Sequence, residues 1–505
     1  MSNPATEDVR VAARRALIDR FPVSLGEDDR QPLRGFTRSQ WKPITAWGVA
    51  VALVSGFVVW VIWFAPGQLT SPLNADDLAA MHPDQRVAAQ INYAAARNQV
   101  RTTLIGAIAG AAFLTTGFFA WRQIVVSRLG QLTDRFTKSV ENLGAAQSAV
   151  RLGGVYALEQ LGEDRRFTRP VAHVLVAFVR QSSESPTPAT AGRSESPRLI
   201  VGNSPSETGV ENPAIVPYEV QDAMMILASK GLWRRGVDAP IALAGVTLPG
   251  INLPRADLRQ AVLYHADLRS ADFRDADLFE ADLRGARLTD AYLLAAKLGD
   301  TWFQRADLSG AHLESVEGGD TKFKEADLHG AYLTYANLPR ADFEQANLHG
   351  VYAESATLTD ARFVEANLAD SRFPAANLTD ADFSSANLRG AILENARLTG
   401  ATLAYANLAD TRLGGAVLVS ANLTGANLPD TNLVGADLTG ANLATANLTT
   451  ANLTDAELTD ANLSGANLCG ATMTDADLTS ANLTGVRSDE RTRWPDGFVP
   501  DSGAD

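Results

Sequence analysis

Few residues of this 505-residue chain have side chains suited to catalysis or metal binding, and their spacing argues against both. The one cysteine, Cys469, excludes a disulfide framework or a cluster of thiolate ligands within a monomer. Two of the six histidines, His329 and His349, stand twenty residues apart, a spacing that would suit a shared metal ion only in a chain coiled with that period. Ser309 and Ala369, the next positions at that spacing, supply no further strong ligand. We therefore expect a solvated histidine pair.

Aspartates are abundant between residues 257 and 382, which raises the question of paired carboxylates acting as acid and base. Most stand directly before a Leu or Phe that recurs every five residues, so their pairing follows from the repeat. The sequence contains no Gly-rich phosphate loop, no nucleophile elbow and no metal-ligand spacing. We expect a protein that is not an enzyme and that binds no cofactor.

The repeat that positions these side chains has a period of five. It runs from Ile241 to about Gly485 without an inserted or deleted residue, with an apolar centre and usually Ala, Ser, Thr or Val two residues earlier. A step of five puts side chains on alternate faces of a strand and scatters them around a helix. A chain that turns a corner after each unit can point every apolar pair inward. The spacing therefore predicts a solenoid.

Phenylalanines indicate how many units complete one coil. They recur every twenty residues at the centre of a unit, at Phe303, Phe323, Phe343, Phe363 and Phe383. A buried aromatic column at this spacing predicts four units per coil and a square cross-section, in which residues i and i+20 stack.

Two positions break the apolar rule. Ala353 replaces the usual Leu or Phe, and Phe373, one coil later, is expected to fill the volume left there. Gly318 has no such compensation, so we expect a local defect or bulge at that unit.

Tandem Ala-(Asp/Asn)-Leu-x-x units, as in "ADLRSADFRDADLFEADL" at residues 266–283, are similar to the pentapeptide-repeat family. The resemblance implies a right-handed quadrilateral parallel β-helix over residues 241–485, with β-turns at its corners. About twelve coils spaced like paired strands would make a rod of roughly 60 Å. A solenoid needs covered ends, and we assign that role to a helix within 218–240 and to the C-terminal segment 486–505, through Trp494 and Phe498.

The segment before the rod is predicted to enter a membrane. After an N-terminal segment, 1–45, two uncharged apolar runs at 46–65 and 102–121 suit transmembrane helices, joined by a loop at 66–101. Arg and Lys flank the pair, so positive-inside counting places both chain termini and the rod in the cytoplasm. In the second run, Gly106 and Gly110 form a small-xxx-small step that could pack a helix dimer. We favour the alternative, that the step reflects ordinary membrane-helix composition or packing on the first span.

Residues 122–181 have a helical pattern, with Thr168 as an expected N-cap. The run "RFTKSVENLG…VRLGGVYALEQL" resembles the juxtamembrane region of two-span, membrane-anchored pentapeptide-repeat proteins. A stretch rich in Ser, Pro, Thr and Gly at 182–217 is predicted to be a disordered linker.

The rod is acidic, with 32 acidic and 16 basic residues between 241 and 485. We therefore expect no direct contact with nucleic acid, and a protein partner in the cytoplasm. The candidate contact is one outer column at twenty-residue spacing: Tyr292, His312, Tyr332, Tyr352, Arg372 and Arg412. Exposed Tyr and Arg are favoured at protein interfaces, although stacking between coils that only stabilises the sheet face would produce the same column.

Three functions are compatible with this organisation. The first is a membrane-anchored cytoplasmic rod that binds or organises another protein, as a monomer or a homo-oligomer. The second follows from the resemblance, since some pentapeptide-repeat proteins inhibit type II topoisomerases as acidic DNA mimics. The third is a sensor in which the outer loop relays a signal to the rod through the second span.

Overall fold

The computed structural model describes residues 56–61, 63–69, 73–184, 216–229 and 243–498. Contacts between residues divide the chain into two compact units, Met1–Leu129 and Gly130–Asp505. Several predicted features fall outside the described residues: the N-terminal segment 1–45, residues 46–55 of the first predicted span, residues 185–215 of the linker, residues 230–242 before the rod, and the tail at 499–505.

The described residues of the first unit are mainly helical. Residues 56–61 are helical, and the helices that follow are α3 (Ala65–Leu69), α4 (Ala75–Ala80) and the first part of α5 (Pro83–Leu143). The segment at 66–101, predicted as a loop, is therefore mostly helix. Residues 84–101 contain neither Pro nor Gly, so nothing in their composition ends the helix. The Arg101 guanidinium lies 5.5 Å from the Trp63 ring centroid, which brings residue 63 beside α5.

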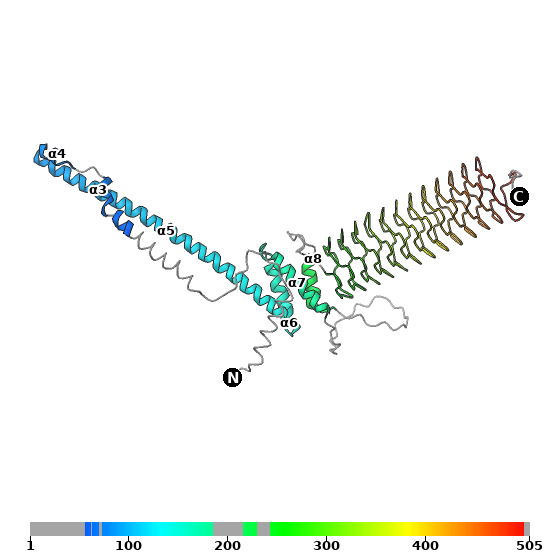
Figure 1. Cartoon of the computed structure of the whole chain (residues 1–505), viewed down its shortest axis with the longest axis horizontal. Helices are drawn as coiled ribbons and strands as arrows, with labels where there is room; N and C mark the ends of the chain where they lie inside the picture. Colours follow the sequence, from blue (N-terminus) through cyan, green and yellow to red (C-terminus); the bar gives the residue numbers. More distant parts are fainter. Residues whose placement is uncertain (1–55, 62, 70–72, 185–215, 230–242, 499–505) are drawn as a thin grey trace, which may run out of the picture. The chain divides into compact units, whose positions relative to one another are not determined.

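Helix α5 is unbroken over 61 residues, and Figure 1 shows it as one continuous ribbon. It contains the predicted second span at 102–121 and continues to Leu143, because no Pro interrupts it after Pro83. Among the described residues it is the one helix long and apolar enough to cross a membrane. Its apolar side chains are open to their surroundings: Phe113 is 80% exposed and Leu114 is 73% exposed.

In the second unit, three helices pack on one another: α6 (Ser148–Leu161), α7 (Thr168–Glu184) and α8 (Tyr218–Ser229). The predicted N-cap at Thr168 is wrong. Thr168 is the first residue of α7, and its hydroxyl donates backwards to the Gly162 carbonyl at 3.0 Å instead of accepting a bond from the first turn. This hydrogen bond stabilises the turn between α6 and α7 instead of the start of α7.

Residues 243–498 form the rod, drawn in Figure 1 as a stack of similar coils. Parallel bridges join residues twenty apart, from Thr247 with Asp267 to Asn467 with Arg487, so four units complete one coil. Each bridge is one residue long, and no continuous strand occurs in the described part of the rod. The predicted parallel pairing is present without true strands because the chain turns after every five residues.

The corners are β-turns that close on the apolar centre of their unit, except at Gly318, whose carbonyl accepts from the Thr321 hydroxyl. In one example, Ala261 N–H donates to Leu258 O at 3.0 Å, and the third turn residue, Gln260, has φ of 60°. A positive φ at that position alone defines a type II turn. In many units an Asp or Asn before the centre adds a second bond, as when Asp272 Oδ1 accepts from Arg274 N–H at 3.1 Å. These side chains therefore occupy their positions because they satisfy turn amides.

The inside of the rod is lined by the predicted column of rings. Phe303, Phe323, Phe343, Phe363 and Phe383 are each no more than 1% exposed. Their successive ring centroids are 4.7–5.1 Å apart, and the ring planes lie within 3° of parallel. This order confirms that the coils are in register.

The two irregular units keep that register. Phe373 is 2% exposed and meets Phe363 edge to face at 6.4 Å, while Ala353 is fully buried. The bulge predicted at Gly318 is wrong, because the flanking bridge from Glu317 to Asn337 is intact. A Cβ at residue 318 would lie 2.7 Å from the Thr321 Oγ1 atom. The Thr321 hydroxyl donates to the Leu298 and Gly318 carbonyls, so it occupies the space that a side chain would need.

Both ends of the rod contact non-repeat chain. At the start, Gln221 of α8 accepts from Asn252 N–H at 2.9 Å, and buried side chains of the helices and rod form one hydrophobic cluster. At the other end, Thr472 pairs with Arg493, one residue beyond the regular spacing. Trp494 and Phe498 stack there at 5.3 Å and pack against the core.

Candidate functional site

The predicted outer column forms an ordered stack, here called the aromatic stripe: Tyr292, His312, Tyr332, Tyr352 and Arg372. Successive ring centroids are 4.9, 4.8 and 5.1 Å apart, with ring planes within 10° of parallel. The Arg372 guanidinium lies 5.4 Å from the Tyr352 ring centroid and ends the stack. Because the neighbouring rings cover each other's faces, a partner would meet mainly ring edges and phenol hydroxyls.

The stripe is exposed and held in place. Tyr292, Tyr332 and Tyr352 are 44%, 37% and 39% exposed. His312 is fixed from the side, since its Nδ1 atom lies 3.0 Å from Glu314 Oε1. The second carboxylate oxygen, Glu314 Oε2, is covered and has no hydrogen-bond partner in the described part of the chain. The stripe is therefore a rigid surface with a local surplus of acceptors.

Arg412, predicted as part of the same column, is separated from the stripe. Ile392 intervenes in the ladder between Arg372 and Arg412. Arg412 Nη2 donates to Glu394 Oε1 at 2.7 Å, an ion pair of its own. The structure thus brings together five of the six residues of the predicted column.

The histidine pair lies at the corner next to the stripe. His329 and His349 stack with centroids 5.1 Å apart, and His349 Nδ1 donates to the Ala369 carbonyl at 2.7 Å. Gly330 and Gly350 separate this pair from Tyr332 and Tyr352, and no atom lies within 4 Å of where their Cβ atoms would be. The corner is therefore an open notch between two short aromatic stacks.

The described residues contain no group of three or more His, Cys, Asp or Glu side chains placed to hold a metal ion. Cys469 is half-buried, at the turn position where its unit has "ANLCG". Gly106 and Gly110 of α5 have no described atom within 4 Å of their Cβ positions, so no described helix packs at the predicted small-xxx-small step.

Sequence reasoning missed a side-chain ladder on another face of the rod. Its seven asparagines each donate from Nδ2 to the Oδ1 atom one coil earlier, at 2.8–3.2 Å, and Asp327 accepts from the first. The members are Asn347, Asn367, Asn387, Asn407, Asn427, Asn447 and Asn467. The signal was present, since Asn recurs there every twenty residues. Such a ladder satisfies polar groups and leaves few of them for a ligand.

Sequence reasoning also missed a buried ion pair between α6 and α8. Glu219 is 2% exposed, and it accepts hydrogen bonds from Arg151 Nε at 2.9 Å and from the Ser148 hydroxyl at 2.7 Å. Burial raises the pKa of Glu219, but hydrogen bonds from Ser148, the main chain and Arg151 outweigh burial and lower the pKa below its ordinary value of 4.5. Arg151 also donates to the Ala145 and Ala146 carbonyls, which ties α8 to the turn after α5.

Comparison with known families agrees with the geometry of the rod. The family model for pentapeptide repeats matches eight copies within residues 242–275, 271–310, 320–350, 356–400, 376–418, 416–455 and 456–487. The chain belongs to the pentapeptide-repeat family. Membership implies a right-handed β-helical solenoid, and pentapeptide-repeat proteins are in general structural or binding proteins without enzymatic activity.

Solved pentapeptide-repeat structures match parts of the chain. HetL, involved in heterocyst differentiation regulation in the cyanobacterium Nostoc sp. strain PCC 7120, is 30% identical; the match covers 46% of this chain and 92% of HetL, with a TM-score of 0.20. A pentapeptide-repeat protein from the Arabidopsis thaliana thylakoid lumen is 35% identical over 19% of this chain and 66% of its own, with a TM-score of 0.19. A trypsin-treated variant of QnrB1, a plasmid-mediated fluoroquinolone resistance protein, is 21% identical. The match covers 34% of this chain and 88% of QnrB1, with a TM-score of 0.27. No curated protein matches the chain.

Proposed function

We propose that the pentapeptide-repeat rod is a non-enzymatic surface that binds or organises a protein partner, with the aromatic stripe as the contact. The observation that carries this proposal is an ordered stack of three tyrosines and a histidine on the outside of the rod. Tyr is enriched at protein interfaces because it offers a large amphipathic contact area. Stacking fixes the rings before binding, so a partner immobilises few side chains on this face.

We further propose that the chain is anchored in a membrane, with the rod in the cytoplasm. Support comes from the length and composition of α5 and from the exposure of Phe113, Leu114 and Trp121, which in water would form a large apolar surface. The contact between Trp63 and Arg101 supports a helical hairpin of the two predicted spans, since it joins the end of one to the start of the other. Extraction of membranes with alkaline carbonate tests this, and release of the chain into the soluble fraction would contradict it.

Proximity labelling tests the role of the stripe. A labelling enzyme fused to the C-terminus of the full-length chain, expressed in its native cell, should enrich a partner. Replacing the stripe tyrosines together, Tyr292→Ser, Tyr332→Ser and Tyr352→Ser, should remove that partner from the labelled set.

A matched variant controls for general loss of surface tyrosine. Tyr335 and Tyr405 are 63% and 70% exposed and lie outside the stripe, so Tyr335→Ser with Tyr405→Ser should leave the labelled set unchanged. Equal enrichment in the stripe variant and the parent chain would reject the stripe as the contact. Labelling of bulk membrane proteins alone would reject the scaffold function itself.

The distribution of charge supports a second candidate, the acidic DNA mimic. From Leu413 to Val486 the rod has seven acidic residues and no Lys or Arg. Such a stretch presents uncompensated carboxylates to a basic DNA-binding surface. A supercoiling assay with the purified full-length chain and a type II topoisomerase tests this second function. Unchanged topoisomerase activity at a micromolar concentration of the chain would discard it.

The continuity of α5 supports the sensor hypothesis. Residues 83–101, expected outside the membrane, belong to the same helix as residues 130–143, and the buried Arg151–Glu219 pair then links the following turn to α8. We expect substitutions within 83–101 to change crosslinking between rods in the membrane. Identical crosslinking in parent and variants would argue against signal relay.

A further inference from the structure

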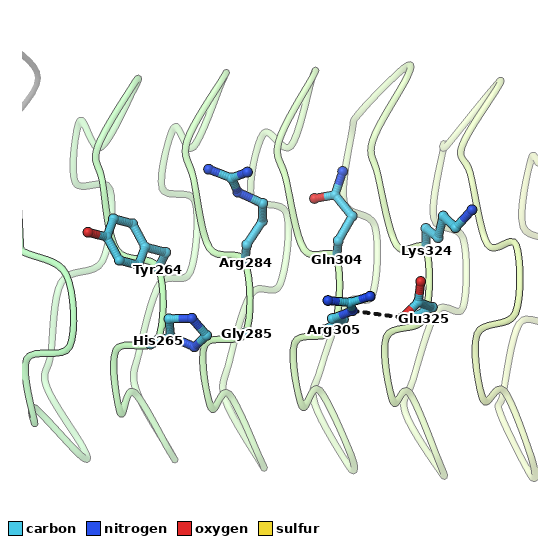
Figure 2. A pocket seen from close by; sticks show the side chains of 8 residues that line it. All are labelled: Tyr264, His265, Arg284, Gly285, Gln304, Arg305, Lys324 and Glu325. Carbon is cyan, nitrogen blue, oxygen red and sulfur yellow. Dashed lines mark hydrogen bonds and ion pairs between the residues drawn. The ribbon is translucent and has the colours of Figure 1, made fainter.

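An open pocket of about 490 Å³ lies on the rod beside the corners of four successive coils. Figure 2 shows two rows of side chains around it, one of them containing Tyr264, Arg284, Gln304 and Lys324. In the second row Gly285 stands between His265 and Arg305, and the His265 ring covers the glycine, with its Nδ1 atom 2.5 Å from where a Gly285 Cβ would lie. The pocket lies about half a coil from the aromatic stripe. Leu294, two residues after Tyr292 of the stripe, comes two five-residue units after Arg284 of the pocket, and four units make one coil.

Two arginines present unused donors to the pocket. Arg284 donates from Nε and Nη2 to Asp282 at 2.8 and 2.7 Å, and its guanidinium lies 4.9 Å from the Trp302 ring centroid. These contacts fix the plane of the guanidinium and leave Nη1 without a partner in the described part of the chain. Arg305 donates only from Nε, to Glu325 Oε2 at 2.7 Å, and both of its Nη groups are without a partner among the described residues. Figure 2 shows this ion pair at the edge of the pocket.

The lining is cationic on a rod that is acidic as a whole. Arg284, Arg305 and Lys324 line the pocket, and Glu325 is the one carboxylate in its lining. The carboxylates that pair with Arg284 and Lys324, those of Asp282 and Glu344, are not among the lining residues. Lys324 is held at one side by Glu344, whose Oε1 atom accepts from Nζ at 2.6 Å. Charged donors positioned by neighbouring carboxylates bind an oxyanion with little loss of side-chain freedom.

The pocket also offers an acceptor and an apolar surface. Gln304 Oε1 is covered and has no hydrogen-bond partner in the described part of the chain, a state that costs free energy. The terminal torsion of Gln is broad, so a small rotation presents this oxygen to a bound N–H donor. The Tyr264 ring, 42% exposed, borders the same space. A free phosphate ion would leave both groups unused.

We propose that this pocket binds an acidic segment of a partner protein, with a Glu or Asp carboxylate on Arg284 and Arg305. The adjoining main-chain N–H of the segment donates to Gln304 Oε1, and its side-chain methylenes lie against Tyr264. The site is independent of the aromatic stripe, so it stands or falls without the function proposed for that surface.

Peptide binding to the full-length chain in detergent micelles tests the proposal. A fluorescent, terminally blocked hexaglutamate should raise its anisotropy on binding, whereas blocked hexaglutamine should not. Arg305→Gln should weaken hexaglutamate binding by about tenfold or more, since it removes charged hydrogen bonds.

The matched control is Arg389→Gln. Arg389 is also exposed and also donates from Nε to one carboxylate, Asp410, at 3.3 Å, but it lies outside the pocket. Its substitution should leave hexaglutamate binding unchanged. Equal affinity of the parent and Arg305→Gln chains, with both melting at the same temperature, would overturn the proposal. Binding of inorganic phosphate that depends on Arg305, without binding of hexaglutamate, would replace the acidic segment with a phosphoryl ligand and also overturn it.

Discussion

Two stacks of aromatic rings run along the same rod, one inside and one outside. The inner column at Phe303–Phe383 and the aromatic stripe have nearly the same ring spacing, 4.7–5.1 Å and 4.8–5.1 Å. They differ in burial, since the inner rings are no more than 1% exposed and the outer tyrosines are at least 37% exposed. The spacing of the coils therefore explains the stacking in both places. The buried rings are required by the packing of the core, whereas the exposed rings are not.

That difference indicates where function can lie. All inner centres except Gly318 and Ala353 have a large apolar side chain, but the outer column continues through Ile392, Asn432 and Thr472 without loss of register. The fold thus accepts almost any residue at that outer position. Under the proposed function these rings serve a partner, whereas stacking between coils would make them part of the fold, and the following substitutions test the distinction.

The largest effect is expected inside the rod. Phe343→Ala removes a ring packed between Phe323 and Phe363 at 4.8 and 4.9 Å, and should lower the free energy of unfolding by about 3–5 kcal/mol. Chemical denaturation followed by circular dichroism measures this loss. Phe343→Leu, the residue found at most other centres, should cost less than about 1.5 kcal/mol. Equal losses in the two variants would contradict this expectation, because they would mean that the stacked ring itself, and not its apolar volume, supplies the stabilisation.

The same contrast between inside and outside applies to charge. Glu219→Gln leaves Arg151 without its buried partner and should cost about 3 kcal/mol. Asp320→Asn breaks an exposed pair with Arg340 and should cost no more than about 1 kcal/mol. Hydrogen exchange of α8 and of the coils around residue 320 measures each change locally. Similar protection of α8 in the parent and Glu219→Gln chains would contradict a stabilising role for the buried pair.

The buried pair also predicts a dependence on pH. Its hydrogen bonds hold the pKa of Glu219 below 4.5, so the folded state favours the ionised carboxylate. The stabilisation is therefore fully present above the unfolded value and is lost as pH falls through the lower folded value. Protection of α8 from hydrogen exchange, corrected for the intrinsic exchange rate, should decrease below about pH 4.5 in the parent chain. The Glu219→Gln chain should lack that component, and identical pH profiles would exclude Glu219 as its source.

A smaller effect is expected at the asparagine ladder. Asn407 donates to Asn387 and accepts from Asn427, both at 3.1 Å, and is partly buried. Asn407 Oδ1 also accepts from the Ala409 N–H at 3.4 Å. Asn407→Ala should cost about 1–2 kcal/mol, because these three hydrogen bonds are lost and the neighbours can partly turn to solvent. Exchange of the amides of residues 387–427 measures the cost. A loss as large as that of Phe343→Ala would show that side-chain ladders rival the apolar core.

The smallest effect on stability is expected at the stripe. Tyr332→Ala removes a ring whose two stacked neighbours remain solvated, and should change the free energy of unfolding by less than about 1 kcal/mol. Partner labelling should nevertheless fall in this variant. A destabilisation comparable with that of Phe343→Ala would assign the stripe to the fold and remove the argument for a binding surface.

The regular part of the molecule could be predicted closely from its sequence. The period of five, the column of Phe at twenty and the parallel pairing all follow from one requirement, that apolar side chains share an inside. The bulge expected at Gly318 was wrong because the Thr321 hydroxyl occupies the missing volume, which spacing cannot reveal. The N-cap at Thr168 was wrong because its hydroxyl is turned toward an earlier carbonyl.

The sequence by itself determined which residues are neighbours along the rod, because in a strict repeat residue i always lies beside residue i+20. Only the tertiary structure decided the rest. Glu219 contacts Arg151 across 68 residues, a pairing that no period encodes. The repeat places Arg284 and Arg305 in neighbouring coils, but only the structure shows that both line one pocket and which of their donors lack partners among the described residues. In the repeat, the spacing of residues along the chain predicts which of them are in contact. Contacts between irregular segments depend instead on how those segments pack in the folded protein.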